Sequence, residues 1–142
     1  MTALAQKKIL IVDDVTFVRN TLREILTGAG YQVVGEAADG AEAVQLYSQL
    51  RPDLVTMDVV MPNMSGIDAT RKILKGHPGA RVVIISAMGQ ENLVMEAVNV
   101  GARDYILKPF TSAEVLTTID RALNSEAIGA AHVGTEAQHG LS

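Results

Sequence analysis

Five short apolar segments alternate with five helix-like segments along this 142-residue chain, and this alternation limits the possible folds more than any other feature. The apolar segments cover residues 8–12, 31–37, 53–58, 80–86 and 104–107. Apolar residues at helical spacing follow each of them, over residues 15–26, 39–50, 66–75, 90–100 and 111–123. Continuous apolar strands separated by helices are typical of parallel sheets covered on both faces. The sequence therefore predicts an α/β fold, (βα)5, with a doubly wound five-stranded parallel sheet.

Two helix starts and one domain boundary can also be predicted. Asp39 with Glu42, and Thr111 with Glu114, have the spacing of N-terminal caps, in which a side-chain oxygen accepts a hydrogen bond from the helix backbone. From residue 124 on, the chain is rich in alanine and glycine and lacks periodicity. We therefore expect one domain over residues 7–124 and a flexible C-terminal tail over residues 125–142.

Composition excludes several classes of protein. The chain has no cysteine, which excludes disulfide scaffolds, thiol nucleophiles and iron–sulfur clusters. Its formal net charge of −4 argues against binding to nucleic acid. No apolar run approaches the roughly 18 residues needed to cross a bilayer, and the first residues form no apolar export signal. We therefore expect a cytoplasmic protein with neither nucleic acid nor a membrane among its partners.

Polar side chains gather where the predicted strands end. Asp13 and Asp14 follow the first strand, Asp58 ends the third, Ser86 ends the fourth and Lys108 follows the fifth. In a doubly wound sheet the carboxyl ends of the strands form the ligand-binding edge, so these groups should meet. Three carboxylates at close range repel each other unless a cation balances them, and all-oxygen ligands suit Mg²⁺. With an ammonium and a hydroxyl added, the set could receive a phosphoryl group on a nucleophilic carboxylate.

Each of these residues also has a plainer interpretation. Asp13 and Asp14 could cap the first helix, and Asp58 could be a turn residue before the Met-Pro pair at 61–62. Tyr105 could be an ordinary half-buried strand residue. We expect the methionines at positions 57, 61, 64, 88 and 95 to fill gaps in the core and loops rather than to form an interaction surface. His77 is expected to be solvated in a turn.

Four stretches carry a family resemblance: IVDD at 11–14, TMDVVMPNMSG at 56–66, SAMG at 86–89 and DYILKPF at 104–110. In this order and spacing they resemble the receiver domain of bacterial two-component response regulators, and among these the single-domain chemotaxis regulators of the CheY type. The resemblance covers about residues 7–124. It implies the flavodoxin-like, CheY-like form of the predicted sheet.

The resemblance also implies a role for each site residue. Asp58 would be the phosphoacceptor, modified to 4-aspartylphosphate. Mg²⁺ would be held by Asp13, Asp14, Asp58 and the backbone carbonyl of Val60. Ser86 and Lys108 would contact the phosphoryl group. Ser86 and Tyr105 would form the conformational switch, and Pro109 would follow a cis peptide bond.

The partners are implied in the same way. A histidine kinase would donate the phosphoryl group, and the fourth helix, fifth strand and fifth helix would form the output face. In a chemotaxis regulator this face would bind the flagellar motor switch; another output protein is the alternative. Val60 and Met88 stand where some chemotaxis regulators have Asn and Glu, whose polar groups can orient an attacking water. We therefore expect slow self-dephosphorylation and a separate phosphatase.

Other functions remain open from the sequence. A phosphorelay intermediate, or the receiver of another two-component pathway, would use the same residues. A small aspartyl-phosphate hydrolase also uses a strand-end Asp, but Val60 stands where its second acid would be. A flavodoxin-like cofactor carrier would need a Gly- or Ser/Thr-rich phosphate loop after the first strand, and none is there. We expect that the protein is not an enzyme and catalyses only its own Mg²⁺-dependent phosphorylation and dephosphorylation.

Overall fold

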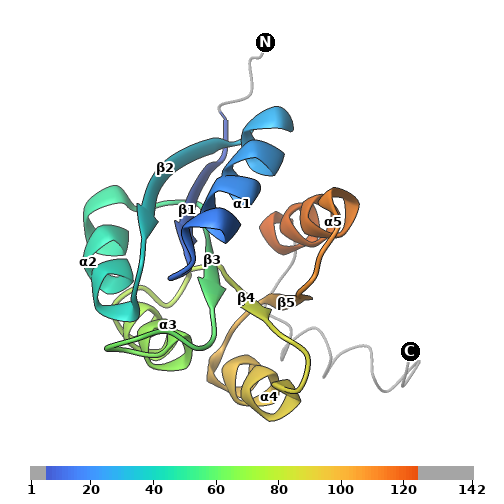
Figure 1. Ribbon diagram of the computed structural model, residues 1–142. Coiled ribbons are helices and arrows are strands. Elements are labelled where there is room, and N and C mark those ends of the chain that lie inside the picture. Colours follow the sequence, from blue (N-terminus) through green and yellow to red (C-terminus); the bar gives the residue numbers. More distant parts are fainter. Residues whose placement is uncertain (1–5, 125–142) are drawn as a thin grey trace, which may run out of the picture.

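Five parallel strands form one sheet in the computed structural model, which describes residues 6–124 (Figure 1). The strands are β1 (Lys8–Val12), β2 (Gln32–Ala37), β3 (Leu54–Asp58), β4 (Val82–Ser86) and β5 (Asp104–Leu107). Their order is β2-β1-β3-β4-β5, so the chain reverses its winding direction after β2. The predicted doubly wound sheet is confirmed. The predicted tail, residues 125–142, lies outside the described residues.

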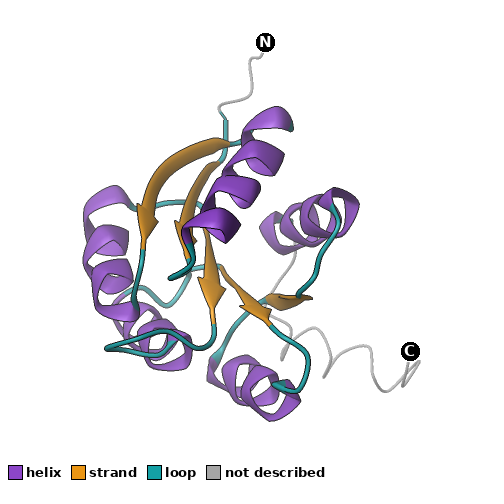
Figure 2. Ribbon diagram, in the orientation of Figure 1, coloured by secondary structure: helices purple, strands orange, loops and turns teal. Residues whose placement is uncertain are grey.

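A helix follows each strand, and the helices cover both faces of the sheet (Figure 2). They are α1 (Thr16–Gly28), α2 (Gly40–Leu50), α3 (Gly66–Gly76), α4 (Glu91–Val100) and α5 (Ser112–Leu123). The side chain of Asp39 accepts a hydrogen bond of 2.8 Å from the backbone N–H of Glu42, as its spacing predicts. Thr111 and Glu114 form the predicted reciprocal capping box at the start of α5.

Two apolar cores lie on opposite faces of the sheet, because successive side chains of a strand point to opposite sides. Under α1 and α5 the core is formed by Ile9, Ile11, Leu22, Leu26, Leu54, Val83, Ile85, Ile106, Val115, Ile119 and Ala122. Under α2, α3 and α4 it includes Leu10, Val12, Val55, Met57, Ile67, Ile73, Val82, Ile84 and Ala97. The inner strands are thus buried on both faces, which explains why they are continuous apolar runs in the sequence.

Two expectations about single residues were wrong, those for Met95 and His77. Met95 is 59% exposed on α4 instead of filling a gap in the core, whereas Met88 lies in the loop after β4, as expected, and is 78% exposed. Helix α4 buries only Val94 and Ala97, so its other face is open and Met95 lies there. His77 is half-buried rather than solvated, and its ring lies 4.9 Å from that of Tyr47.

No helix among residues 6–124 is long and apolar enough to span a membrane.

Candidate functional site

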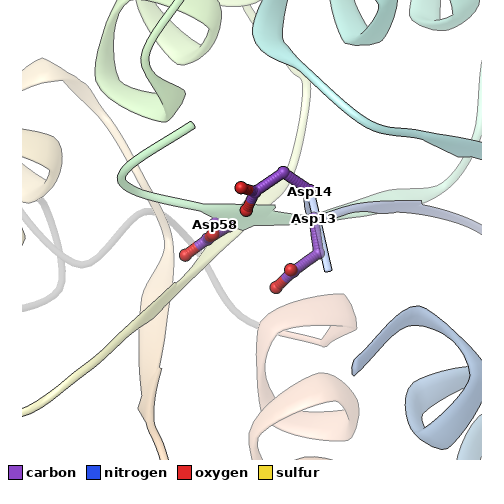
Figure 3. A group of neighbouring side chains, drawn as sticks. All are labelled: Asp13, Asp14 and Asp58. Carbon is purple, nitrogen blue, oxygen red and sulfur yellow. The ribbon is translucent and has the colours of Figure 1, made fainter. Parts of the chain in front are cut away.

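Three carboxylates meet at the carboxyl end of the sheet (Figure 3). Asp13 and Asp14 follow the last residue of β1, and Asp58 is the last residue of β3, the neighbouring strand. One oxygen from each carboxylate lies within 4.8 Å of the others. Asp13 and Asp58 are buried, whereas Asp14 is exposed, so the cluster is open to solvent on one side. The structure therefore brings together the three acidic residues singled out from the sequence.

Asp13 is fixed by its backbone and by its side chain. Its backbone N–H donates to the carbonyl of Ala37 over 3.0 Å. Its Oδ1 accepts a 2.9 Å hydrogen bond from the N–H of Val15, which is itself the N-cap residue of α1. Neither aspartate is therefore the N-cap, and the capping interpretation is wrong. The other oxygen, Oδ2, has no hydrogen bond within the described chain and lies 3.2 Å from Nζ of Lys108.

Lys108 brings an ammonium group to the cluster from the end of β5. Its Nζ lies 3.2 Å from Oδ2 of Asp13 and 3.6 Å from Oδ1 of Asp58. Its backbone N–H donates to the carbonyl of Ser86 over 2.7 Å, which ties it to the end of β4. The Lys108–Pro109 peptide bond is cis, as the resemblance implies.

Burial raises the pKa of Asp58 to about 7, and the carboxylate of Asp13 adds to the rise. The ammonium of Lys108 opposes it, while Asp14 raises the pKa further. One cation facing three carboxylates does not balance their charge. A divalent cation would do so, and carboxylate oxygens are the donors that Mg²⁺ prefers. The donor chemistry of this cluster thus fits Mg²⁺.

Ser86 brings a hydroxyl group to the end of β4. It is fully buried at the end of β4, and its Oγ has no hydrogen-bond partner among residues 6–124. A buried hydroxyl without a partner costs free energy, roughly 1–3 kcal/mol, so a group that hydrogen-bonds to it would be favoured. Its neighbours in the sheet place it beside the cluster, because β4 pairs with β3 so that Ile85 lies opposite Asp58.

The loop after β3 is packed closely against Asp58. A Cβ atom on Gly66 would overlap the carbonyl oxygen of Asp58, so only glycine fits there. The N–H of Gly66 donates to the carbonyl of Val59 over 2.8 Å. The side chain of Val60 is 52% exposed beside this turn.

Tyr105 is 44% exposed on β5, so its side chain is only partly covered by the rest of the domain and is not an ordinary core residue.

One residue that contacts the cluster was missed in the sequence analysis. Arg19 of α1 donates a hydrogen bond of 2.5 Å to the carbonyl of Asp13. A signal was present: an arginine on an apolar helix face, where its neighbours Val18 and Leu22 pack into the core. A long side chain at that place must reach a polar group at the end of the helix.

A family model for the response regulator receiver domain matches residues 9–120. The chain belongs to this family. The receiver domain is 50% identical to a chemotaxis protein CheY of Thermotoga maritima over 115 residues, which cover 81% of this chain and 96% of that protein. It is 49% identical to a protein named CcdB of Bacillus subtilis, over 82% of this chain and 97% of the relative.

One similar solved structure is a complex that contains beryllofluoride and Mg²⁺. The receiver domain superposes with a TM-score of 0.77 on a chain of the CheX-CheY-BeF3-Mg²⁺ complex from Borrelia burgdorferi. The two are 40% identical, over 80% of this chain and 86% of the other. The closely similar sheet is thus found in a protein crystallised with Mg²⁺ and beryllofluoride.

Proposed function

We propose that this receiver domain is a phosphorylation-activated response regulator, in which Asp58 accepts a phosphoryl group from a histidine kinase. The observation that carries the proposal is the meeting of Asp13, Asp14 and Asp58 with Nζ of Lys108 at one edge of the sheet. In the transfer a carboxylate oxygen of Asp58 forms a bond to phosphorus as the P–N bond of the phosphohistidine breaks. The histidine nitrogen leaves with the electron pair of that bond.

Mg²⁺ is the cofactor that these residues fit. Asp13, Asp14, Asp58 and the backbone carbonyl of Val60 would hold it, and it would neutralise charge on the phosphoryl oxygens. Lys108 lies close enough to Asp58 to pair with a phosphoryl group there. The unpartnered Oγ of Ser86 would donate a hydrogen bond to the same group. Both residues act on the equatorial oxygens, where charge builds up in the transition state.

The switch would begin at Ser86 and end at Tyr105. A hydrogen bond from Ser86 to the phosphoryl group would draw the loop after β4 toward Asp58. Tyr105, which is half exposed and lines a groove of about 420 Å³ together with Met88, would then turn inward. The output face would comprise α4, β5 and α5, on which Met95, Tyr105 and Leu107 are exposed.

Chemotaxis is the pathway favoured by the relatives. The Thermotoga maritima relative is named a chemotaxis protein, so we propose the flagellar motor switch, or another output protein, as the partner of this face. We further propose the cytoplasm as the location, one domain over residues 7–124, and a separate phosphatase. A phosphorelay intermediate would use the same site. A small-molecule hydrolase is disfavoured, since Val60 offers no second acid and the domain would act only on its own Asp58.

The decisive experiment is incubation with acetyl phosphate and Mg²⁺, followed by intact-mass measurement. We expect a base-labile adduct of one phosphoryl group that is absent from Asp58→Asn and present in Asp53→Asn. Asp53→Asn is a matched substitution at the amino end of β3, the strand whose carboxyl end carries Asp58. An adduct that persists in Asp58→Asn, or none in the unaltered protein, would overturn the proposal. Repeated turnover of p-nitrophenyl phosphate would favour the hydrolase instead.

A further inference from the structure

Arg19 joins helix α1 to the backbone of the acidic pair. Its Nη1 donates to the carbonyl oxygen of Asp13 over 2.5 Å, and its Nη2 donates to Oγ1 of Thr16 over 3.2 Å. The Arg19 side chain is only 16% exposed, and its bond to Asp13 is partly buried, whereas its bond to Thr16 is exposed. The third donor, Nε, points to Glu36 of β2, whose Oε1 lies 3.1 Å away. Each of the three nitrogens of the guanidinium thus donates a hydrogen bond.

Glu36 fixes the direction of that guanidinium. It sits in the half-buried part of β2, opposite Ile11 in the register of β1 and β2. The next residue, Ala37, accepts the backbone N–H of Asp13 over 3.0 Å. The peptide groups on both sides of Asp13 are therefore held from β2: the N–H directly by Ala37, and the carbonyl through Arg19 and Glu36. This support acts where β1 has ended and the sheet ladder with β3 has stopped at Val12.

We propose that Arg19, oriented by Glu36, is a positioning residue for the Mg²⁺ site. It fixes the peptide between Asp13 and Asp14, so that both carboxylates converge with Asp58 before the cation arrives. This inference rests on the proposed function, because it concerns the same cation. Residues that hydrogen-bond to metal ligands commonly set the affinity for the metal, because they orient those ligands. The alternative is a helix–strand ion pair that only stabilises the fold.

Charge has to be separated from geometry in the test. A neutral residue at position 19 would remove a positive charge near the cluster, and that change alone would strengthen the binding of a cation. Arg19→Lys keeps the charge but loses the planar fork, because one ammonium cannot serve Asp13, Thr16 and Glu36 in the same fixed directions. Arg23→Lys is the matched control. Arg23 pairs with the same Glu36, over 2.6 Å, and within residues 6–124 it makes no hydrogen bond or ion pair with Asp13.

The experiment is a Mg²⁺ titration of the full chain, in which the changes in backbone amide chemical shifts in ¹⁵N NMR spectra report binding. We expect Arg19→Lys to raise the Kd for Mg²⁺ by about tenfold, while Arg23→Lys leaves it within about twofold. The dispersion of the spectra and the Tm report separately on the fold. Equal Kd values for Arg19→Lys and the unaltered protein would overturn the inference. So would equal weakening in Arg23→Lys, because the ion pair would then act only through stability.

A second variant keeps the inference testable if Arg19→Lys does not fold. Glu36→Asp keeps the negative charge and leaves the bond from Arg19 to Asp13 possible, but its shorter side chain withdraws the carboxylate that directs the guanidinium. A raised Kd in a well-dispersed Glu36→Asp spectrum supports the inference, and an unchanged Kd overturns it. If the unaltered protein shows no Mg²⁺-dependent shifts at all, the proposed function itself fails.

Discussion

At the scale of single residues, the buried Asp58 carboxyl makes folding depend on pH. Its pKa is raised from 3.8 to about 7 by burial and by Asp13. Between these two values the folded protein binds a proton that the unfolded chain has released, so the free energy of unfolding falls as pH rises toward 7. At about 1.4 kcal/mol per unit, the loss from this one residue is of order 4 kcal/mol.

Asp58→Asn should therefore stabilise the Mg²⁺-free protein at high pH. The amide cannot ionise, so the variant and the unaltered protein should differ by only about 1 kcal/mol near pH 4.5, just above the ordinary pKa of 3.8. By pH 8 the variant should be more stable, by up to about 4 kcal/mol. Urea unfolding in EDTA at both pH values measures the difference. Parallel pH curves for the two proteins would contradict this picture of Asp58.

The apolar residues around Asp58 lead to a kinetic prediction. Val60 and Met88 are 52% and 78% exposed, and neither can orient a water molecule. Replacing them together, Val60→Asn with Met88→Glu, should speed the loss of phosphate from Asp58 by about tenfold, since positioned polar groups assist proton transfer. The half-life of the phosphorylated protein in Mg²⁺, after removal of acetyl phosphate, measures this. Met95→Glu, a polar substitution on α4 remote from Asp58, is the control and should leave the half-life unchanged.

At the scale of helices and strands, local signals predicted most of the structure. The caps at Asp39 and Thr111 form as their spacing indicates, because cap hydrogen bonds join residues only three positions apart. The strands follow from their apolar runs. The exposure of Met95 could not be read in the same way, because it depends on which face of α4 packs against the sheet. A methionine has no preference strong enough to reveal that.

The junction between α3 and Asp58 gives a prediction about stability. Gly66→Ala would place a methyl group against the carbonyl oxygen of Asp58, so the start of α3 must shift. We expect a loss of stability of about 2 kcal/mol or more and slower phosphorylation by acetyl phosphate. Gly76→Ala, at the other end of α3, has no atom within 4 Å of the added Cβ. It should be neutral or slightly stabilising; equal losses in the two variants would show that the overlap at Gly66 is not the cause.

At the scale of the whole molecule, the site exists only because of the strand order. Asp13, Asp58 and Lys108 lie at the ends of three strands that are far apart in sequence. Because ligands bind at the carboxyl ends of such strands, the sequence alone predicts that these residues meet. The rule fixes the edge but not the contacts. The 3.2 Å and 3.6 Å distances from Lys108, and the support of Asp13 by Arg19, depend on side-chain packing across α1, β2 and β5. The local pattern at Arg19 indicates that its side chain must reach a polar group, but no local pattern in the sequence identifies the partner or these distances.

Because the cluster forms only in the folded chain, Mg²⁺ should stabilise the whole domain. A ligand that binds only the native state adds RT ln(1 + [L]/Kd), about 1.4 kcal/mol when Mg²⁺ is in tenfold excess over its Kd. For a domain of this size that is a rise in Tm of about 5 °C, measurable by differential scanning calorimetry. Asp14→Asn should abolish most of the rise, since it removes an exposed ligand with little effect on packing. Asp53→Asn, at the opposite edge of the sheet, should retain it, and a rise that survives in Asp14→Asn would place the Mg²⁺ site elsewhere.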